Sequence, residues 1–482
     1  MNELSYTKNT FYLVAAGTLS QIFSAAQKII LVNYLKEEGM AIYQSAICVY
    51  SVFITLACGG MPLALTHFIS KERSLGKENN IYAGFRFALF AMCSVGFFLS
   101  LIMFMTRGFF AVAMKDLGAE HAIAALSPSV FFVAAGAAVK GFFEGYSNML
   151  PCSVSQALES LIKLALAYFL TSFLCVFSVS YAALGGTLAI TLGEAFATAV
   201  LFIFLMSFLR KIKTSDRKIR LKTHTSLIAY ALPITVYAII LSSLELAENA
   251  VIRNSLLAIR FSEGQAKAFF LKYSPYTSVF DAVIISKKLT LKGAGWLYGA
   301  FFGYALTVIR FPAGLLRMFS VSLFPLAAKH FAKGDCDALG KDLSRIIRIM
   351  LLISVPVCAV TVIFSNLITE LLFGSSAYSL MLNASSPLLV FAPISSAFST
   401  VEYASGRTFA PFLFGFISYM ISIPLCFILI RVPNINILGA AITLTVSAFC
   451  EFIMSYFFIT RRLKIKIELF PDFFTKKENH AY

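Results

Sequence analysis

Apolar residues gather in long blocks along this chain, and short polar segments separate the blocks. Stretches of about 20 or more mostly apolar residues recur from one end to the other. A helix needs roughly that length to cross a hydrocarbon core about 30 Å thick. Because lipid offers the backbone no hydrogen-bond partners, each stretch is expected to be a helix. The pattern therefore predicts an all-α polytopic membrane protein.

We predict about twelve transmembrane helices in two groups of six. The first six are expected near 11–35, 41–65, 83–105, 121–141, 152–173 and 181–207. The second six are expected near 226–252, 295–325, 345–373, 380–402, 409–430 and 437–460. The domains that follow are an N-terminal six-helix lobe at 1–207, a basic linker at 208–225, a C-terminal six-helix lobe at 226–460 and a basic tail at 461–482.

Short motifs recur in the same order in both halves. PLALTHF at Pro62 is answered by PLAAKHF at Pro325, and SPSVFF at Ser127 is answered by SPLLVF at Ser386. LGGTLAIT at Leu184 is likewise answered by LGAAITLT. The order indicates a duplicated unit, and six spans per unit give both lobes the same orientation. Two such lobes are expected to be related by a pseudo-two-fold axis along the membrane normal, with a transport path between them.

Composition and charge agree with a membrane location. Only 13% of the residues are charged, and the mean hydropathy is +0.81. With a cytoplasmic N-terminus, the most basic segments all fall on the cytoplasmic side, as the positive-inside rule requires; they are 71–77, 210–222, 329–341 and 461–477. The net charge of +16 is thereby explained without a nucleic-acid partner. One further basic segment, the insertion at 260–294, is expected outside the cytoplasm, as a loop or as a short amphipathic helix on the membrane surface.

The sequence offers no pattern for catalysis or metal binding. The nine cysteines are dispersed and form no C-x-x-C, so neither a metal nor a redox pair is predicted. No Ser/His/Asp constellation and no nucleotide-binding G-x-x-x-x-G-K-[ST] is present. We therefore expect a protein that is not an enzyme and has no cofactor, apart from a coupling ion such as Na⁺ or H⁺.

Polar side chains inside the predicted spans are the candidate site, because charges in lipid are costly and usually face a wet cavity. The candidate cavity cations are Lys28, Lys163, Arg253, Arg310 and Arg317, and the candidate polar residues are Gln21, Gln156, Glu159 and Asn249. Glu159 and Lys163 are spaced to pair across one helical turn. Arg310 lies near the middle of its span with no acid within four residues. The cations at 28, 253 and 317 lie near span ends, where reaching the headgroups is the alternative.

Glycine and proline predict interruptions in corresponding spans of the two lobes. Gly60 and Pro62 lie in the second span, and Pro312 and Pro325 lie in the eighth. Proline removes a backbone hydrogen bond and kinks a helix. Paired breaks of this kind are typical of transporter hinges, and a static kink for packing is the alternative.

Several of these segments resemble one family. GGMPLALTHFISKE from Gly59, GFFEGYSNMLPCSVSQALESLIK from Gly141, LYGAFFGYALTVIRFPAGLL from Leu297 and NILGAAITLT from Asn436 are similar to the stage V sporulation protein B group of polysaccharide-biosynthesis flippases. The block from Glu144 to Glu159 is the most specific. This group belongs to the multidrug/oligosaccharidyl-lipid/polysaccharide exporter (MOP) superfamily and is similar to the lipid II flippases.

The resemblance implies a MATE-like fold with two six-helix lobes in a V shape. It also implies alternating access and export of an undecaprenyl-pyrophosphate-linked sugar precursor for cell wall, spore cortex or surface polysaccharide. Cavity arginines would hold the pyrophosphate. A monomer in the bacterial plasma membrane, with both termini cytoplasmic, is expected. The chain departs from the group at His67, where Lys or Arg is common, in the 260–294 insertion, and in ending near where spans thirteen and fourteen of the group begin.

Two other functions stay open at this point. A cation-coupled multidrug exporter of the same superfamily needs an intramembrane carboxylate, and Glu194, Glu245, Glu248 and Glu451 are available. The first span, however, contains no acid. A non-transporting membrane scaffold for wall assembly is the other alternative.

Overall fold

The computed structural model describes residues 3–75, 78–210, 221–262, 265, 284–285 and 288–467. Within these residues, 11 helical segments are long and apolar enough to cross a membrane. The first of them, Val14–Arg73, contains two of the predicted spans, so the expectation of about twelve transmembrane helices is confirmed.

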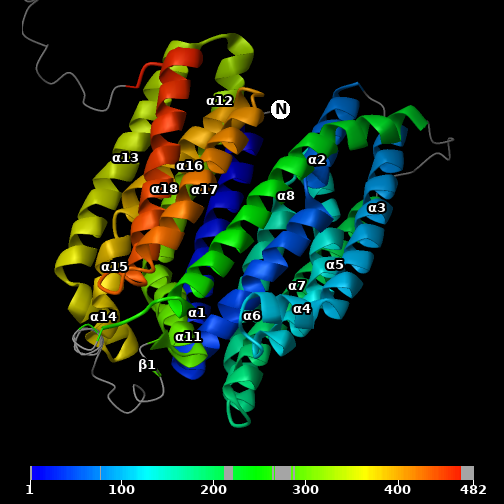
Figure 1. The fold of residues 1–482 in the computed structure, drawn as a ribbon. Helices are drawn as coiled ribbons and strands as arrows, with labels where there is room; N and C mark the ends of the chain where they lie inside the picture. The colour runs from blue at the N-terminus through cyan, green and yellow to red at the C-terminus, as the bar shows by residue number, and fades with distance from the viewer. Residues whose placement is uncertain are drawn as a thin grey trace, which may run out of the picture.

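The helices form two bundles (Figure 1). The N-terminal bundle consists of α1 (Glu3–Cys58), α2 (Met61–Ser74), α3 (Glu78–Met105), α4 (Arg107–Ala113), α5 (Ala119–Gly145), α6 (Leu150–Leu174) and α7 (Val179–Leu209). Its core forms where α5, α6 and α7 pack on one another and on α1.

The C-terminal bundle follows after α8 (Leu221–Leu257). It consists of α11 (Leu291–Gly299), the π-helix η1 (Ala300–Ala305), α12 (Leu306–Lys333), α13 (Cys336–Ile363), α14 (Ser365–Phe373), the short 3₁₀ helix η2 (Ser376–Tyr378), α15 (Ser379–Ser385), α16 (Leu388–Ala404), α17 (Phe409–Leu429), α18 (Leu438–Phe457) and the π-helix η3 (Phe458–Arg462). Between the bundles, α8 packs on α1 and α2 on one side and on α17 on the other.

The bundles lie closest at the end that holds α11 and β1, and they diverge toward the end that holds the N-terminus (Figure 1). At the close end, α11 and η1 pack on α1. Gly299 makes the approach feasible, because a Cβ there would stand 1.8 Å from the backbone oxygen of Glu37. The buried rings of Tyr298 and Phe301 then continue the core from one bundle into the other.

The first two predicted spans are separated by a backbone break at Lys36, where φ is 53°. A second break follows at Gly59, where φ is 43°, and α2 begins after Gly60 with a proline in its first turn. Glycine adopts positive φ readily, and proline suits the start of a helix. The backbone N–H of Gly60 donates to Oγ1 of Thr235 on α8, at 2.8 Å. The predicted interruption at Gly60 and Pro62 is therefore present.

The corresponding interruption predicted in the eighth span is absent from the structure. Helix α12 is continuous through positions 312 and 325, so the expected breaks at Pro312 and Pro325 are wrong. The irregular turn lies earlier instead, in η1. Membrane helices tolerate proline where neighbouring groups and local adjustments satisfy the freed carbonyl.

Other differences concern element ends. The predicted span at 345–373 is two helices, α13 and α14, and the span at 380–402 is divided between α15 and α16 near Pro387. In the predicted insertion, β1 (Ile284–Ile285) and β2 (Lys288–Leu289) form an antiparallel pair. Most of that insertion, most of the 208–225 linker and residues 468–482 lie outside the described residues.

Candidate functional site at the junction of the two bundles

Three cationic side chains converge where α1 meets α12. Lys28 lies on the first half of α1, and Arg310 and Arg317 lie two turns apart on α12. The two helices touch at Gly314, where a Cβ would stand 2.5 Å from Oε1 of Gln21. This contact brings Arg310 within charge-interaction range of both Lys28 and Arg317. We call Lys28, Arg310 and Arg317 the junction cations.

The junction cations lack close carboxylate partners. None of the three forms an ion pair within the described part of the chain. Glu245 on α8 is the acid whose charge interacts with Arg310 at longer range. Arg310 shares a helix face with Gly314, one turn later on α12, which packs against Gln21 of α1. The cluster therefore keeps a net positive charge between the bundles.

Lys163 is in a different environment, inside the N-terminal bundle. Its Nζ lies 2.7 Å from Glu159 and 2.6 Å from Glu194, and Lys140 lies 3.7 Å from Glu159. The predicted one-turn pair of Glu159 and Lys163 is confirmed. Two lysines thus balance two glutamates: Glu194, from the neighbouring helix α7, adds a second acid beside the candidate cavity cation Lys163.

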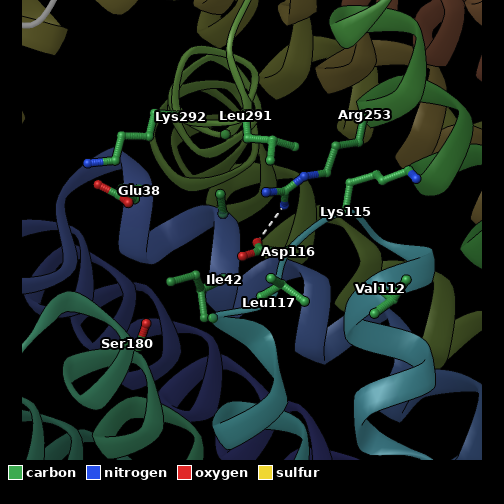
Figure 2. A pocket seen from close by; sticks show the side chains of 13 residues that line it. Glu38, Ile42, Val112, Lys115, Asp116, Leu117, Ser180, Arg253, Leu291 and Lys292 are labelled. Atoms are coloured by element: carbon green, nitrogen blue, oxygen red, sulfur yellow. Dashed lines mark hydrogen bonds and ion pairs between the residues drawn. The ribbon is translucent and has the colours of Figure 1, made fainter. Parts of the chain in front are cut away.

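Arg253 is also compensated. Its Nη1 lies 2.6 Å from Oδ2 of Asp116 and 3.0 Å from Oγ of Ser45, and its guanidinium lies 5.6 Å from the ring centre of Tyr298. Arg253 comes from α8, and Asp116 comes from the loop after α4 in the other bundle (Figure 2). The side chain is only 4% exposed. The candidate cavity cation Arg253 is therefore neutralised by Asp116 of the N-terminal bundle.

A pocket of about 370 Å³ opens above this ion pair. Its lining includes charged side chains of both signs from both bundles, among them Glu38, Lys115 and Lys292 (Figure 2). Asp116 and Ser45 were not among the residues singled out from the sequence. Asp116 lies between the third and fourth predicted spans together with a second acid, Glu120, so the sequence did not single it out.

The candidate polar residues lie in different parts of the structure. Gln21 contacts Gly314 at the junction, whereas Gln156 and Glu159 lie on α6 within the N-terminal bundle. Asn249, which is 4% exposed, donates to the backbone oxygen of Glu245 and accepts from the hydroxyl of Tyr298, both at 2.8 Å. Asn249 is thus engaged in packing α8 against α11.

His67, the position that departs from the family pattern, lies on α2. Its ring stacks on Tyr230 of α8 with a centroid distance of 4.9 Å. In the described residues, no group of three or more His, Cys, Asp or Glu side chains has the arrangement of a metal site.

The arrangement of the junction cations is suited to holding an anionic group between the two bundles.

Comparisons with known proteins agree with this architecture. The sequence profile of the polysaccharide biosynthesis protein family matches residues 6–284, and that of the lipid II flippase MurJ matches residues 283–479. The chain is 22% identical to stage V sporulation protein B of Bacillus subtilis, over 97% of this chain and 86% of that protein. It is also 22% identical to the lipid II flippase MurJ of the same organism, over 90% and 78% of the two chains.

Solved structures show the same fold. An inward-facing multidrug resistance MATE family transporter of the MOP superfamily superimposes with a TM-score of 0.66 at 13% identity, over 94% of this chain and 98% of that one. A MOP superfamily transporter from Pyrococcus furiosus gives 0.67 at 14% identity, over 95% and 96%. The MATE-like fold is confirmed. Because its profile matches more than half of the sequence, the chain belongs to the polysaccharide biosynthesis protein family.

Proposed function

We propose that this protein is a flippase for a lipid-linked saccharide precursor in the bacterial plasma membrane. Its substrate is an undecaprenyl-pyrophosphate-linked sugar destined for cell wall, spore cortex or surface polysaccharide. The observation that carries the proposal is the cluster of junction cations, Lys28, Arg310 and Arg317, without ion-pair partners among the described residues. The transport step makes and breaks no covalent bond, so the protein acts as a transporter and not as an enzyme.

The charge of the cluster suits a pyrophosphate. A diphosphate headgroup loses its hydration when it enters a region of low dielectric, and cations must replace that hydration. Arginine does so with paired N–H donors that match phosphate oxygens, while lysine supplies a point charge. A cation that is already paired with a carboxylate stabilises a phosphate group less effectively. For that reason Lys163 and Arg253 are left out of the proposed substrate site.

A change in the relative orientation of the two bundles would carry the headgroup across the membrane. The headgroup would bind the junction cations from the cytoplasmic side, where the bundles diverge, while the prenyl tail stays in the lipid. Rocking of the bundles would then expose the headgroup on the opposite side. The break at Gly60 and Pro62 is the proposed hinge, with α8 attached to both bundles. We propose that one chain suffices, that both termini are cytoplasmic, and that an ion gradient supplies the energy.

The relatives support this substrate class over the multidrug alternative. The matched profiles and curated relatives are named for polysaccharide biosynthesis, sporulation and lipid II flipping, and they are nearer in sequence than the MATE transporters. The cation-rich junction also disfavours a cationic drug as cargo, because like charges repel.

Ligand binding by the purified protein distinguishes the three candidate functions: flippase, drug exporter and scaffold. We expect an undecaprenyl pyrophosphate to bind more tightly than the monophosphate, and a cationic dye to bind weakly. Arg310→Ala should lower the affinity for the pyrophosphate by roughly 10- to 100-fold, the effect of losing a charge-assisted hydrogen bond. Arg86→Ala is the matched control, since Arg86 is an exposed arginine on α3 outside the cluster. Tight dye binding with no preference for pyrophosphate would favour the drug exporter, and binding of neither would favour a scaffold.

A further inference from the structure

Glu402 is a buried carboxyl group that the substrate site does not use. It lies in the last turn of α16 and is 0% exposed. Among the residues that the structure describes, neither carboxylate oxygen has a hydrogen-bond partner. An ionised carboxylate that is buried without a hydrogen bond or a counter-charge is strongly disfavoured. The position therefore requires a bound positive charge or a proton.

A second acid lies beside Glu402. Glu451 on α18 is close enough for the two carboxyl charges to interact, and Tyr403 lies within charge-interaction range of both. Oγ of Ser455 lies next to the Glu402 carboxyl without completing a hydrogen bond, and it too lacks a partner. Like charges this close disfavour double ionisation.

No cation in the described part of the chain forms an ion pair with either carboxyl group. Helix α16 packs on α12, α13 and α18, and also touches α17. Within the described residues, no lysine or arginine on these helices forms an ion pair with Glu402 or Glu451. The charged group that interacts with Glu402 comes from α18 and is itself an acid.

Aromatic rings pack over the same turn. Phe398, one turn before Glu402, stacks on Phe452 at a centroid distance of 5.7 Å and lies 6.3 Å from Tyr456. Phe398 is fully buried. The surroundings are therefore apolar, which favours the neutral form of a carboxyl group. A proton needs one oxygen and no hydration shell, so it suits a site this enclosed.

We infer that Glu402, with Glu451 beside it, is a proton-binding site within the C-terminal bundle. A proton from solvent converts one carboxylate to the carboxylic acid, and its release reverses that step without any other bond changing. Intramembrane carboxyls of this kind are functional sites by default.

Titratable groups connect this site with the junction cations. Tyr419 on α17 is within charge-interaction range of Glu451, Glu248 and Glu245. Glu245 in turn interacts with Arg310. A change of charge at Glu402 and Glu451 is thus transmitted through neighbouring groups toward the substrate site. The coupling to transport rests on the proposed function, whereas proton binding does not.

Infrared spectroscopy of the full-length protein in detergent, titrated from about pH 5 to about pH 9, tests proton binding without any substrate. We expect the carbonyl band of a protonated, weakly hydrogen-bonded carboxyl that disappears as the pH rises. The band should be absent in Glu402→Gln and retained in Glu370→Gln, an exposed glutamate on α14 of the same bundle. Glu451→Gln should keep the band and shift the pH at which it disappears.

Because the charge of Glu451 favours protonation of Glu402, neutralising Glu451 should move the titration of the band to lower pH if Glu451 is ionised when Glu402 is protonated. An unchanged titration would mean that the two acids do not act as a pair and would overturn the paired site.

Two further outcomes decide the proposal. If Glu402→Gln fails to fold, Ser455→Ala replaces it: removing the adjacent hydroxyl should shift the frequency of the same band, and an unshifted band would contradict the assignment. Replacing choline by Na⁺ at constant pH should leave the band unchanged. Loss of the band on adding Na⁺ would show a sodium site and overturn the proton assignment, while leaving the proposed flippase function untouched.

Discussion

The guanidinium of Arg253 and the carboxylate of Asp116 form a buried ion pair, 2.6 Å between Nη1 and Oδ2, that connects the two bundles. In the proposed alternating access the bundles would separate at this end, and the pair would break in each cycle. Ser45, from the second half of α1, also accepts from Arg253 and adds a second contact across the junction.

Asp116→Asn should destabilise the conformation in which this end is closed. Removing one partner of a buried pair leaves an uncompensated charge and costs about 3–5 kcal/mol. We expect a lower thermal unfolding midpoint and, between spin labels on α4 and α11, a distance distribution shifted to longer values. Glu120→Gln is the control, since its pair with Arg107 is partly exposed and contributes at most about 1 kcal/mol. Equal effects of the two substitutions would contradict a special role for Asp116.

Lys28→Gln should stabilise the protein while weakening substrate binding. The charge of Lys28 loses hydration by burial and is also repelled by Arg310, so removing it relieves both costs. The expected result is a higher unfolding midpoint together with lower affinity for undecaprenyl pyrophosphate. A lower midpoint with unchanged affinity would mean that Lys28 is a packing residue.

Lys163→Met should have the opposite effect on stability. It leaves Glu159 and Glu194 facing each other with only Lys140 nearby, which is expected to lower the unfolding midpoint strongly. Adding Glu159→Gln and Glu194→Gln to the same chain should restore much of the loss. If the triple variant is as unstable as the single variant, unpaired charges are not the cause of the lower unfolding midpoint.

Gly299→Ala tests the close contact of α11 with α1. The added Cβ would meet the backbone oxygen of Glu37 at 1.8 Å, so the helices must separate. Overpacking of this kind typically costs about 1–3 kcal/mol. Gly108→Ala, in α4, adds the same group where nothing lies within 4 Å, and it should be neutral or slightly stabilising. Similar unfolding midpoints for the two variants would contradict the contact.

Local features of the fold were predictable from the sequence. The spans follow from the length of apolar stretches, and the break before Pro62 follows from two consecutive glycines. The pair of Glu159 and Lys163 was predictable because residues four apart share a helix face. Pro312 was misleading, since its surroundings keep α12 continuous.

Features that depend on packing between helices were not predictable. Asp116 and Arg253 are 137 positions apart, and nothing in either segment identifies the other as its partner. The same holds for Glu194, which approaches Lys163 from α7. Arg310 was recognisable as an unusual charge in a span, but its convergence with Lys28 depends on the contact of Gln21 with Gly314.

Flipping by reconstituted protein tests the central claim most directly. Proteoliposomes would carry a fluorescent undecaprenyl-pyrophosphate-linked saccharide, and its arrival in the opposite leaflet would be followed by quenching from outside. We predict flipping by the unmodified protein and by Arg86→Ala, and little or none by Arg310→Ala at equal incorporation into the membrane. Unimpaired flipping by Arg310→Ala, with Lys28→Gln and Arg317→Ala equally active, would contradict the assignment of the junction cations as the substrate site.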